Sequence, residues 1–292
     1  MKLVYNQEQR TRLDVFLSDS FPEYSRSQIA NLIREGEVKV NGTLPKISST
    51  LKINDIIIIP DQIIKRPTPK QLDLNIVYED DFCIVINKPS GVITHAKGLN
   101  NTEGSVATFI KPLVSPELKG NRAGIVHRLD RGTSGVMIAA KTKFAQDYLQ
   151  RQFAKRQTRK RYIAIITGTL DKEEAIINMP IERNPRKPSS FRVGVNGKSA
   201  QTYYKAIGNS DIYTAILLEP KTGRTHQLRV HLKAIGHPIV GDDFYGGEPS
   251  KRLMLHASSL EVILPDIGRI EFKAKLPEEF LEYVNINPDS YE

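Results

Sequence analysis

From residue 72 onward the chain consists largely of short apolar runs that end in turn-forming residues, and this pattern restricts the fold more than any other feature. The runs have the length and composition of β-strands, and they occupy 74–80, 82–89, 123–130, 135–142, 161–168, 199–208, 211–220 and 253–262. Helical patterns interrupt them at 143–155 and 225–235. We therefore predict an α+β fold, with a mostly antiparallel mixed β-sheet and flanking helices.

The first sixty residues follow a different pattern. Residues 12–33 predict two helices, because their apolar side chains recur at helical spacing in two groups. A short strand is expected at 37–42, which ends in an Asn-Gly turn signal, and an apolar stretch follows at 51–60. The proline-containing stretch after it is typical of a linker. We predict a small α/β N-terminal domain at 1–62, a linker at 63–71 and a larger domain at 72–292.

Positive charge is concentrated in one part of the chain. The net charge is +9 and the isoelectric point is about 9.4, which favours polyanionic partners. Between Lys141 and Arg192, thirteen basic and five acidic residues give a net charge of +8. The densest part is KRQTRKR at 155–161, which indicates either a solvated face or a surface that binds nucleic acid.

Several classes of protein are excluded by what the sequence lacks. The single cysteine, Cys83, excludes an internal disulfide and a multi-cysteine zinc site. No apolar stretch approaches the roughly 20 residues of a membrane-spanning helix, and the N-terminus lacks the apolar core of a signal peptide. No glycine-rich phosphate-binding loop and no nucleophile elbow are present. We expect a cytoplasmic protein with no membrane partner, no metal and no cofactor.

A polar loop between two apolar runs carries the first candidate site residue. In GIVHRLDRGTSG, Asp130 is flanked by Arg128 and Arg131 and is followed by a turn-forming stretch. Nearby guanidinium groups stabilise the ionised form of a carboxyl group. An ionised aspartate is a poor general acid but a dependable nucleophile or hydrogen-bond anchor. The alternative interpretation is an arginine–aspartate clamp that only stabilises a turn.

The second candidate stretch is PKTGRTHQLRVHLKAIGHP at 220–238. Its apolar spacing predicts a helix with Thr225 as the N-cap, and this places Arg224 just before the helix N-terminus. Partial positive charge at a helix N-terminus adds to that of the arginine, so the position suits a carboxylate or a phosphate. We interpret Arg229 and His231 as part of an exposed polar face of this helix.

Tyr162 is the third candidate, because it opens an apolar strand directly after the basic cluster. A tyrosine at the edge of a basic groove can stack on a nucleobase, a contact worth about 1–3 kcal/mol. The alternative interpretation is an ordinary core tyrosine.

Three of these stretches, taken in order, resemble one enzyme family. HRLDRGTSG, RKRYIAI and GRTHQLRVH are similar to the signature of the large-subunit ribosomal RNA pseudouridine synthases, the Rlu family. NKPSGVITH and HPIVGDDFYG match that family as well, so the resemblance covers about residues 72–280. Separately, residues 12–60 resemble the S-four RNA-binding domain, chiefly through SRSQIANLIREGEVKVNG.

The resemblance implies an RNA pseudouridine synthase that uses no cofactor, and it points to large-subunit ribosomal RNA as substrate. The family's essential aspartate matches Asp130, which is expected to act as a nucleophile on a flipped-out uridine. The family's tyrosine matches Tyr162, which is expected to stack on the uracil. Its arginine matches Arg224, which is expected to pair with Asp130. Arg128 is expected to fill the space that the displaced nucleotide leaves.

Basic side chains in both domains are the expected RNA contacts. They are Arg128, Arg131, Lys155, Arg156, Arg159, Lys160, Arg161, Arg26, Arg34 and Lys39. Residues 1–62 contain eight basic and eight acidic residues, so the N-terminal domain is expected to bind RNA only through a face on which its basic residues gather.

Several alternatives stay open at this point. A catalytically silent RNA-binding or ribosome-assembly factor could keep the same fold, and relatives in this family also act on transfer RNA. A ribosomal RNA methyltransferase would need a Rossmann-like glycine loop, which the sequence lacks. A DNA-binding protein would need a helix with base-reading side chains. Nothing in the sequence requires more than a monomer.

Overall fold

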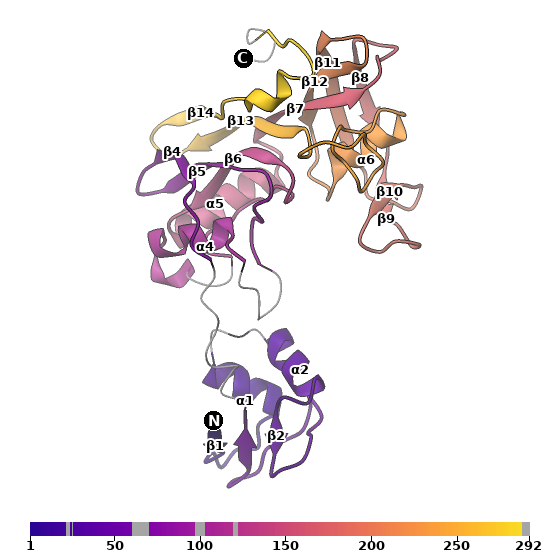
Figure 1. The fold of residues 1–292 in the computed structure, drawn as a ribbon. Coiled ribbons are helices and arrows are strands. Elements are labelled where there is room, and N and C mark those ends of the chain that lie inside the picture. Colours follow the sequence, from indigo (N-terminus) through magenta and orange to yellow (C-terminus); the bar gives the residue numbers. More distant parts are fainter. Residues whose placement is uncertain (22–23, 25, 60–69, 97–102, 119–121, 288–292) are drawn as a thin grey trace. The chain divides into compact units, whose positions relative to one another are not determined.

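The computed structural model describes residues 1–21, 24, 26–59, 70–96, 103–118 and 122–287 (Figure 1). The chain divides into two compact units. The first comprises Met1–Lys70 and Ala96–Glu103, and the second comprises Gln71–His95 and Gly104–Glu292. The predicted linker at 63–71 lies outside the described residues, apart from its last two positions.

The first unit packs two helices on a small sheet. Helices α1 (Leu13–Ser20) and α2 (Arg26–Arg34) confirm the two helices predicted within 12–33. Strands β1 (Lys2–Val4), β3 (Ile56–Ile58) and β2 (Lys39–Val40) form an antiparallel sheet in that order. Apolar side chains from both helices and from β3 are buried together and form the core of this unit.

A nine-stranded sheet forms the centre of the second unit. Eight strands lie in the order β4-β5-β6-β13-β7-β12-β11-β8, and β14 pairs with β13. Their bounds are β4 (Asn75–Glu79), β5 (Cys83–Lys88), β6 (Ser134–Ala140), β7 (Arg159–Thr167), β8 (Glu174–Asn178), β11 (Gln201–Asn209), β12 (Tyr213–Pro220), β13 (Leu255–Leu264) and β14 (Gly268–Lys273). Among the described strands only β6 and β13 pair in parallel, so the predicted mostly antiparallel α+β fold is confirmed.

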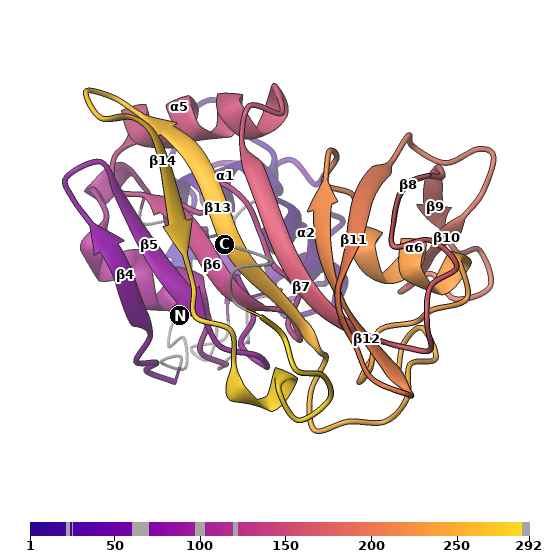
Figure 2. The ribbon, with the colours of Figure 1, turned by 90° about the horizontal axis from the view of Figure 1, so that it is seen from above.

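Among the described residues, three α-helices accompany this sheet. They are α4 (Val106–Ile110), α5 (Lys143–Ala154) and α6 (Gln227–Ala234), and they lie on one side of it in Figures 1 and 2. Thr142 caps α5 by accepting a hydrogen bond from the Ala145 amide. Short 3-10 turns occupy Lys111–Leu113, Pro116–Leu118 and Glu278–Phe280. Within the described part of the chain, none of the helices has the length and apolar character that crossing a membrane requires.

The buried apolar side chains of the second unit form two large cores and a small cluster that contains Ile181 and Val230. One large core is built on β5, β6, α4 and α5, and the other on β7, β12, α6 and the C-terminal segment. Figure 2 shows β7 and β13 running between the β4–β6 side of the sheet and the β8–β11–β12 side. Tyr162 on β7 packs against both cores. Residues from the two halves therefore meet near this tyrosine.

The prediction of a strand at 123–130 was wrong. Only one isolated bridge forms there, between Ile125 and Ala139. Ala123 and Gly124 both have positive φ angles, which end extended structure before the polar residues that follow. This segment is a loop that leads into β6.

Strand β1 of the first unit was not predicted, and neither were four described strands of the second unit. They are β8, β9 (Ile181–Arg183), β10 (Phe191–Val193) and β14, and β9 and β10 form a separate antiparallel hairpin. These strands carry charged or exposed side chains at many positions, so they lack the apolar runs by which the others were recognised.

Candidate active site

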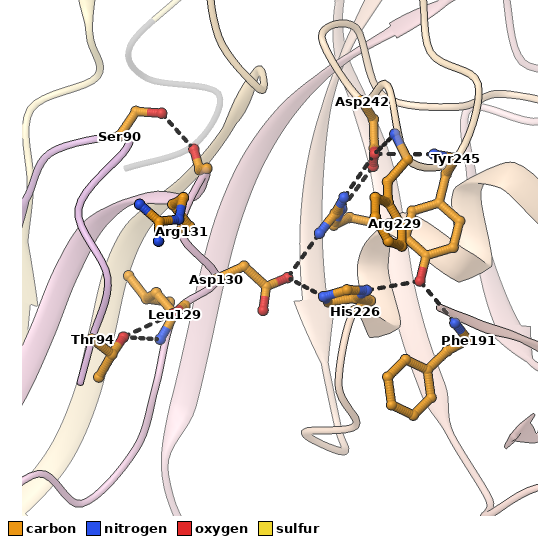
Figure 3. Close-up of polar contacts among 12 residues, drawn as sticks. Ser90, Thr94, Leu129, Asp130, Arg131, Phe191, His226, Arg229, Asp242 and Tyr245 are labelled. Atoms are coloured by element: carbon orange, nitrogen blue, oxygen red, sulfur yellow. Dashed lines mark hydrogen bonds and ion pairs between the residues drawn. The ribbon is translucent and has the colours of Figure 1, made fainter. Parts of the chain in front are cut away.

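The loop that carries Asp130 is held on both sides by short hydrogen bonds. Before it, the Thr94 hydroxyl donates to the Leu129 carbonyl at 2.8 Å and accepts from the Leu129 amide at 3.3 Å. After it, the Ser90 hydroxyl donates to the Gly132 carbonyl at 2.7 Å (Figure 3). Leu129 is itself buried in the core formed by β5 and β6. The loop is therefore fixed before any substrate binds.

A buried lysine strengthens this loop further. The Lys88 ammonium group is inaccessible to solvent and donates to the carbonyl oxygens of Val92 at 2.7 Å, Pro89 at 3.0 Å and Arg131 at 3.3 Å. Burial lowers the pKa of Lys88 to about 7, although the nearby carboxylate of Asp130 opposes that shift. The role of this residue could not be found from the sequence, because it depends on three carbonyl groups that only the folded loop brings together.

Two side chains from the region of α6 contact the Asp130 carboxylate. Arg229 Nη1 lies 3.3 Å from Oδ2, and His226 Nε2 lies 3.8 Å from the same oxygen. Figure 3 shows both side chains pointing toward this oxygen from the opposite side of the site. Within the described residues, no hydrogen bond or ion pair involves Oδ1.

Arg229 is itself fixed by a second carboxylate. Its Nε and Nη2 donate to the two oxygens of Asp242 at 2.7 and 2.8 Å, in the two-point geometry that arginine forms with carboxylates. Asp242 is buried and also accepts hydrogen bonds from the amides of Phe244 and Tyr245. Although burial opposes the charge on Arg229, the Asp242 carboxylate raises its pKa. The guanidinium group therefore remains charged and oriented.

The expected pairing of Arg224 with Asp130 was wrong. Arg224 Nε donates to the Ser199 carbonyl at 3.0 Å, and Arg229 is the arginine that pairs with Asp130. The physical reason is where the helix begins. Arg224 precedes α6 in a turn, whereas Arg229 lies in the first turns of the helix, on the side that faces the aspartate loop. Both arginines belong to GRTHQLR, so spacing along the chain could not distinguish them.

Two further expectations for this helix were also wrong. Arg229 and His231 do not form an exposed polar face: the Arg229 side chain is only 12% exposed, and His231 is buried against Thr202 and the Met179 carbonyl. The N-cap is His226 rather than Thr225, and it has a left-handed backbone conformation with no side-chain cap. The buried Gln227 side chain instead bonds the Arg224 amide and holds the turn.

Asp130 and Tyr162 line one cavity of about 130 Å³. Arg128, Arg224, His226 and Arg229 also contribute to its walls. Burial raises the pKa of the Tyr162 hydroxyl, and the negative charge of Asp130 adds to the shift. The phenol therefore stays protonated at neutral pH. The structure thus brings all three predicted catalytic residues into one cavity, and adds His226 and Arg229 to them.

A second cavity of about 390 Å³ shares part of this wall. Its lining contains five basic side chains and no acidic one: Arg128, Arg156, Lys160, Lys221 and Arg224. Burial lowers the pKa of Lys160 to about 8, and the charge of Arg156 contributes. Such a cavity suits a segment of a polyanion.

The basic residues at the start of strand β7 lie on two opposite faces of the sheet. Successive side chains of a strand point to opposite faces, so Lys160 and Tyr162 share the face that lines the cavities. Arg159 and Arg161 point the other way and form ion pairs with glutamates, at 3.6 Å with Glu261 and 3.1 Å with Glu219 respectively. The structure does not bring these two arginines to the site. Lys155 is exposed at the end of α5 and lines neither cavity.

The remaining predicted RNA-contacting residues lie elsewhere. Arg131 is exposed, and its side chain reaches the Gly91 carbonyl on the far side of the aspartate loop. In the first unit, Arg26 is ion-paired with the buried Asp14, Arg34 bonds Asn31, and Lys39 is exposed. Across the described ranges, no group of three or more His, Cys, Asp or Glu side chains is placed to hold a metal ion.

A fixed carboxylate, a partly buried tyrosine and a basic cavity on this mixed sheet suit an enzyme that modifies RNA. Residues 82–234 match the family model for RNA pseudouridylate synthase, and residues 11–57 match the model of the S4 (S-four) domain. The chain belongs to the RNA pseudouridylate synthase family, whose members isomerise uridine to pseudouridine in RNA.

Individual relatives are similar over nearly the whole chain. The chain is 37% identical to ribosomal large subunit pseudouridine synthase D of Haemophilus influenzae, over 97% of this chain and 93% of that protein. It is 35% identical to the protein of the same name from Escherichia coli O157:H7, over 96% and 92%. Among solved structures, human RNA pseudouridylate synthase domain containing 1 superposes with a TM-score of 0.59 at 28% identity, covering 74% of this chain and 89% of that one.

Proposed function

We propose that this enzyme converts one or more uridines of large-subunit ribosomal RNA to pseudouridine, with Asp130 as the nucleophile. The observation that carries the proposal is the Asp130 carboxylate, held by Arg229 in a cavity that Tyr162 also lines. The curated relatives that match most of the chain are named as ribosomal large subunit pseudouridine synthases.

The proposed reaction needs only groups that the cavity supplies. Asp130 attacks C1′ of the sugar of the flipped-out nucleoside, and the bond between C1′ and N1 breaks. The uracil turns, its C5 bonds to C1′, and the bond between Asp130 and C1′ breaks. A proton leaves C5 and N1 gains one, so the reaction is an isomerisation that requires no redox partner. The ring of Tyr162 stacks on the uracil, and its protonated hydroxyl can donate a hydrogen bond during the turn.

Taking a base out of an RNA helix costs a few kcal/mol, which contacts elsewhere must offset. Arg128 is exposed between the two cavities and is placed to occupy the position that the nucleotide leaves. Arg156 and Lys160 line the second cavity and are the proposed contacts to neighbouring phosphates. Five further basic residues are proposed to contact RNA outside the two cavities: Arg131, Lys155, Arg26, Arg34 and Lys39. Arg159 and Arg161 are not part of this proposal, because they pair with glutamates on the opposite face.

Pseudouridine mapping across cellular RNA, in cells with and without this protein, tests the substrate. Loss of specific sites in large-subunit ribosomal RNA is the expected result. Loss of pseudouridine sites in transfer RNA alone would contradict the proposed substrate but would agree with the proposed activity. An unchanged map would favour a catalytically silent RNA-binding factor. A monomeric state and a cytoplasmic location remain predictions, which sedimentation and fractionation would check.

A further inference from the structure

His226 occupies a conformation that a histidine rarely adopts. It precedes α6 with φ 56° and ψ 20°, in the left-handed region. A residue other than glycine in such a conformation costs on the order of 1–3 kcal/mol, and such residues gather at functional sites. The aromatic rings of Phe191, Phe244 and Tyr245 pack edge-on around the imidazole, with centroid distances of 5.6–6.0 Å. The ring is therefore held in one orientation.

Hydrogen bonding around Tyr245 favours one tautomer of the neutral His226 ring. The Tyr245 hydroxyl oxygen accepts the Phe191 amide hydrogen at 3.1 Å and lies 2.8 Å from His226 Nδ1 (Figure 3). A hydroxyl has one hydrogen to donate, and Nδ1 is the acceptor that the described residues place within its reach. A hydroxyl that donates to Nδ1 leaves the proton of the neutral imidazole on Nε2, and this tautomer provides a donor on the side of Asp130.

The neutral form of the ring follows from its surroundings. Burial lowers the pKa of His226, and the positive charge of Arg229 adds to this, while Asp130 opposes it. The Nε2–H bond then points at Asp130 Oδ2, 3.8 Å away. Hydrogen bonds in a site without its substrate are often long, and they shorten when the substrate binds.

We propose that His226 is a positioning residue, in which the Nε2–H tautomer fixed by Tyr245 holds Oδ2 of Asp130 and leaves Oδ1 to attack the nucleoside. Arg229 contacts the same oxygen, so both donors hold the carboxylate in the same orientation. Oδ1 has no partner among the described residues, which agrees with its role as the reacting atom. The inference rests on the proposed role of Asp130 as nucleophile.

Two substitutions of His226 separate the role of the Nε2 donor from the effect of the backbone. Asn accepts the left-handed conformation better than most residues, but it is too short to reach Asp130. Gln is more strained there, but its amide can place an N–H donor near the position of Nε2. We expect His226→Asn to lower kcat by roughly 10-fold to 100-fold with little change in KM, because the carboxylate is misplaced. We expect His226→Gln to retain most of the activity.

Substitution at Tyr245 tests the tautomer. Tyr245→Phe removes the hydrogen bond to Nδ1, so we expect a lower kcat and a changed pH profile. Tyr203→Phe is the matched control, because it removes an exposed tyrosine hydroxyl bonded to Glu174, away from the site. His237→Asn is the control for His226, since His237 bonds the Thr167 carbonyl and lines neither cavity.

Nitrogen NMR of the histidine-labelled full chain gives a readout that does not depend on activity. We expect the His226 signals to show a protonated Nε2 and an unprotonated Nδ1, and Tyr245→Phe to disturb this state. A protonated Nδ1 in the wild type, or full activity in His226→Asn, would overturn the inference. If Asp130→Asn were active, the proposed nucleophile would be wrong instead, so the two failures can be distinguished.

Discussion

Asp130 contacts its protein partners through one oxygen, and both partners come from the region of α6 while the aspartate comes from the loop before β6. At the scale of residues, the site therefore depends on groups about 100 positions apart in the chain. Asp130 and Tyr162, which we propose meet the substrate, were selected from the sequence because each lies in a distinctive motif, and the structure places both in the wall of one cavity. The arginine that holds the aspartate could not, because the start of α6 decides which of two candidates faces the loop.

The first prediction compares these two arginines. We expect Arg229→Lys to lower turnover by about 10²-fold. A lysine cannot bond Asp242 at two points and still reach Asp130, so the carboxylate is misplaced. Displacement of a reacting group by about 1 Å has an effect of this size. We expect Arg224→Lys to weaken RNA binding and leave turnover at saturating RNA much less affected. Single-turnover assays over a range of RNA concentrations measure both effects. Equal losses of turnover in the two variants would contradict the assignment of Arg229.

The second prediction concerns the charge of Lys160. Because burial lowers the pKa of this lysine to about 8, its ammonium group is charged at pH 7 and largely neutral at pH 9. We expect RNA affinity to fall as the pH rises through this range, since an attraction to phosphate is lost. Binding titrations of catalytically inactive protein at a series of pH values check this.

Two variants make the assignment to Lys160 specific. Lys160→Gln is expected to bind RNA more weakly at pH 7 and to remove most of the change between pH 7 and pH 9. Lys172→Gln, at an exposed lysine that lines neither basic cavity, is the control and should keep the pH dependence. An undiminished pH effect in Lys160→Gln would show that another group titrates.

At the scale of elements, the alternation of side chains along β7 separates residues that composition alone would group together. The sequence showed one basic run, and the alternation of the strand divides it into a cavity face and a face paired with glutamates. Most long strands and helices were predictable from apolar periodicity. Strands β8, β9, β10 and β14 were not, because their exposed positions interrupt the apolar pattern.

The third prediction concerns the parallel junction of β6 and β13. Gly135 has φ +114°, and a Cβ atom there would lie 2.2 Å from the Ala257 carbonyl oxygen of the neighbouring strand. Because the clash is with backbone, no side-chain rotation relieves it. We expect Gly135→Ala to lower the free energy of unfolding by about 1–3 kcal/mol, measured by urea denaturation. Gly223→Ala, which meets no atom within 4 Å, should change stability little. Equal stability of the two variants would contradict the close approach.

At the scale of the whole molecule, the chain combines a small helix-and-sheet unit with a catalytic unit that has two large cores of its own. The existence of both could be predicted from the sequence, because the hydrophobic pattern changes near residue 72. The meeting of the two cores at Tyr162 could not, since it depends on a sheet order in which β13 lies between β6 and β7.

The fourth prediction tests the contribution of the N-terminal unit. Residues 1–62 carry no net charge, so any RNA binding there must come from locally grouped basic residues. We expect a chain without these residues to bind RNA more weakly and with a shallower dependence of affinity on salt. On single-stranded RNA the slope should fall by about 0.7 for each phosphate that this unit neutralises in the full chain. Binding isotherms at several salt concentrations measure this. An unchanged affinity and slope would contradict an RNA-binding role for this unit.

The most direct test of the account is pseudouridine formation by Asp130→Asn, measured beside RNA binding by the same protein. The substitution keeps the size of the side chain and removes its charge and nucleophilicity. We predict that product formation falls below detection while RNA affinity stays within several-fold of the wild type. Product formation at a rate close to the wild type would contradict the account, because the carboxylate held by Arg229 would then not be the group that attacks the uridine.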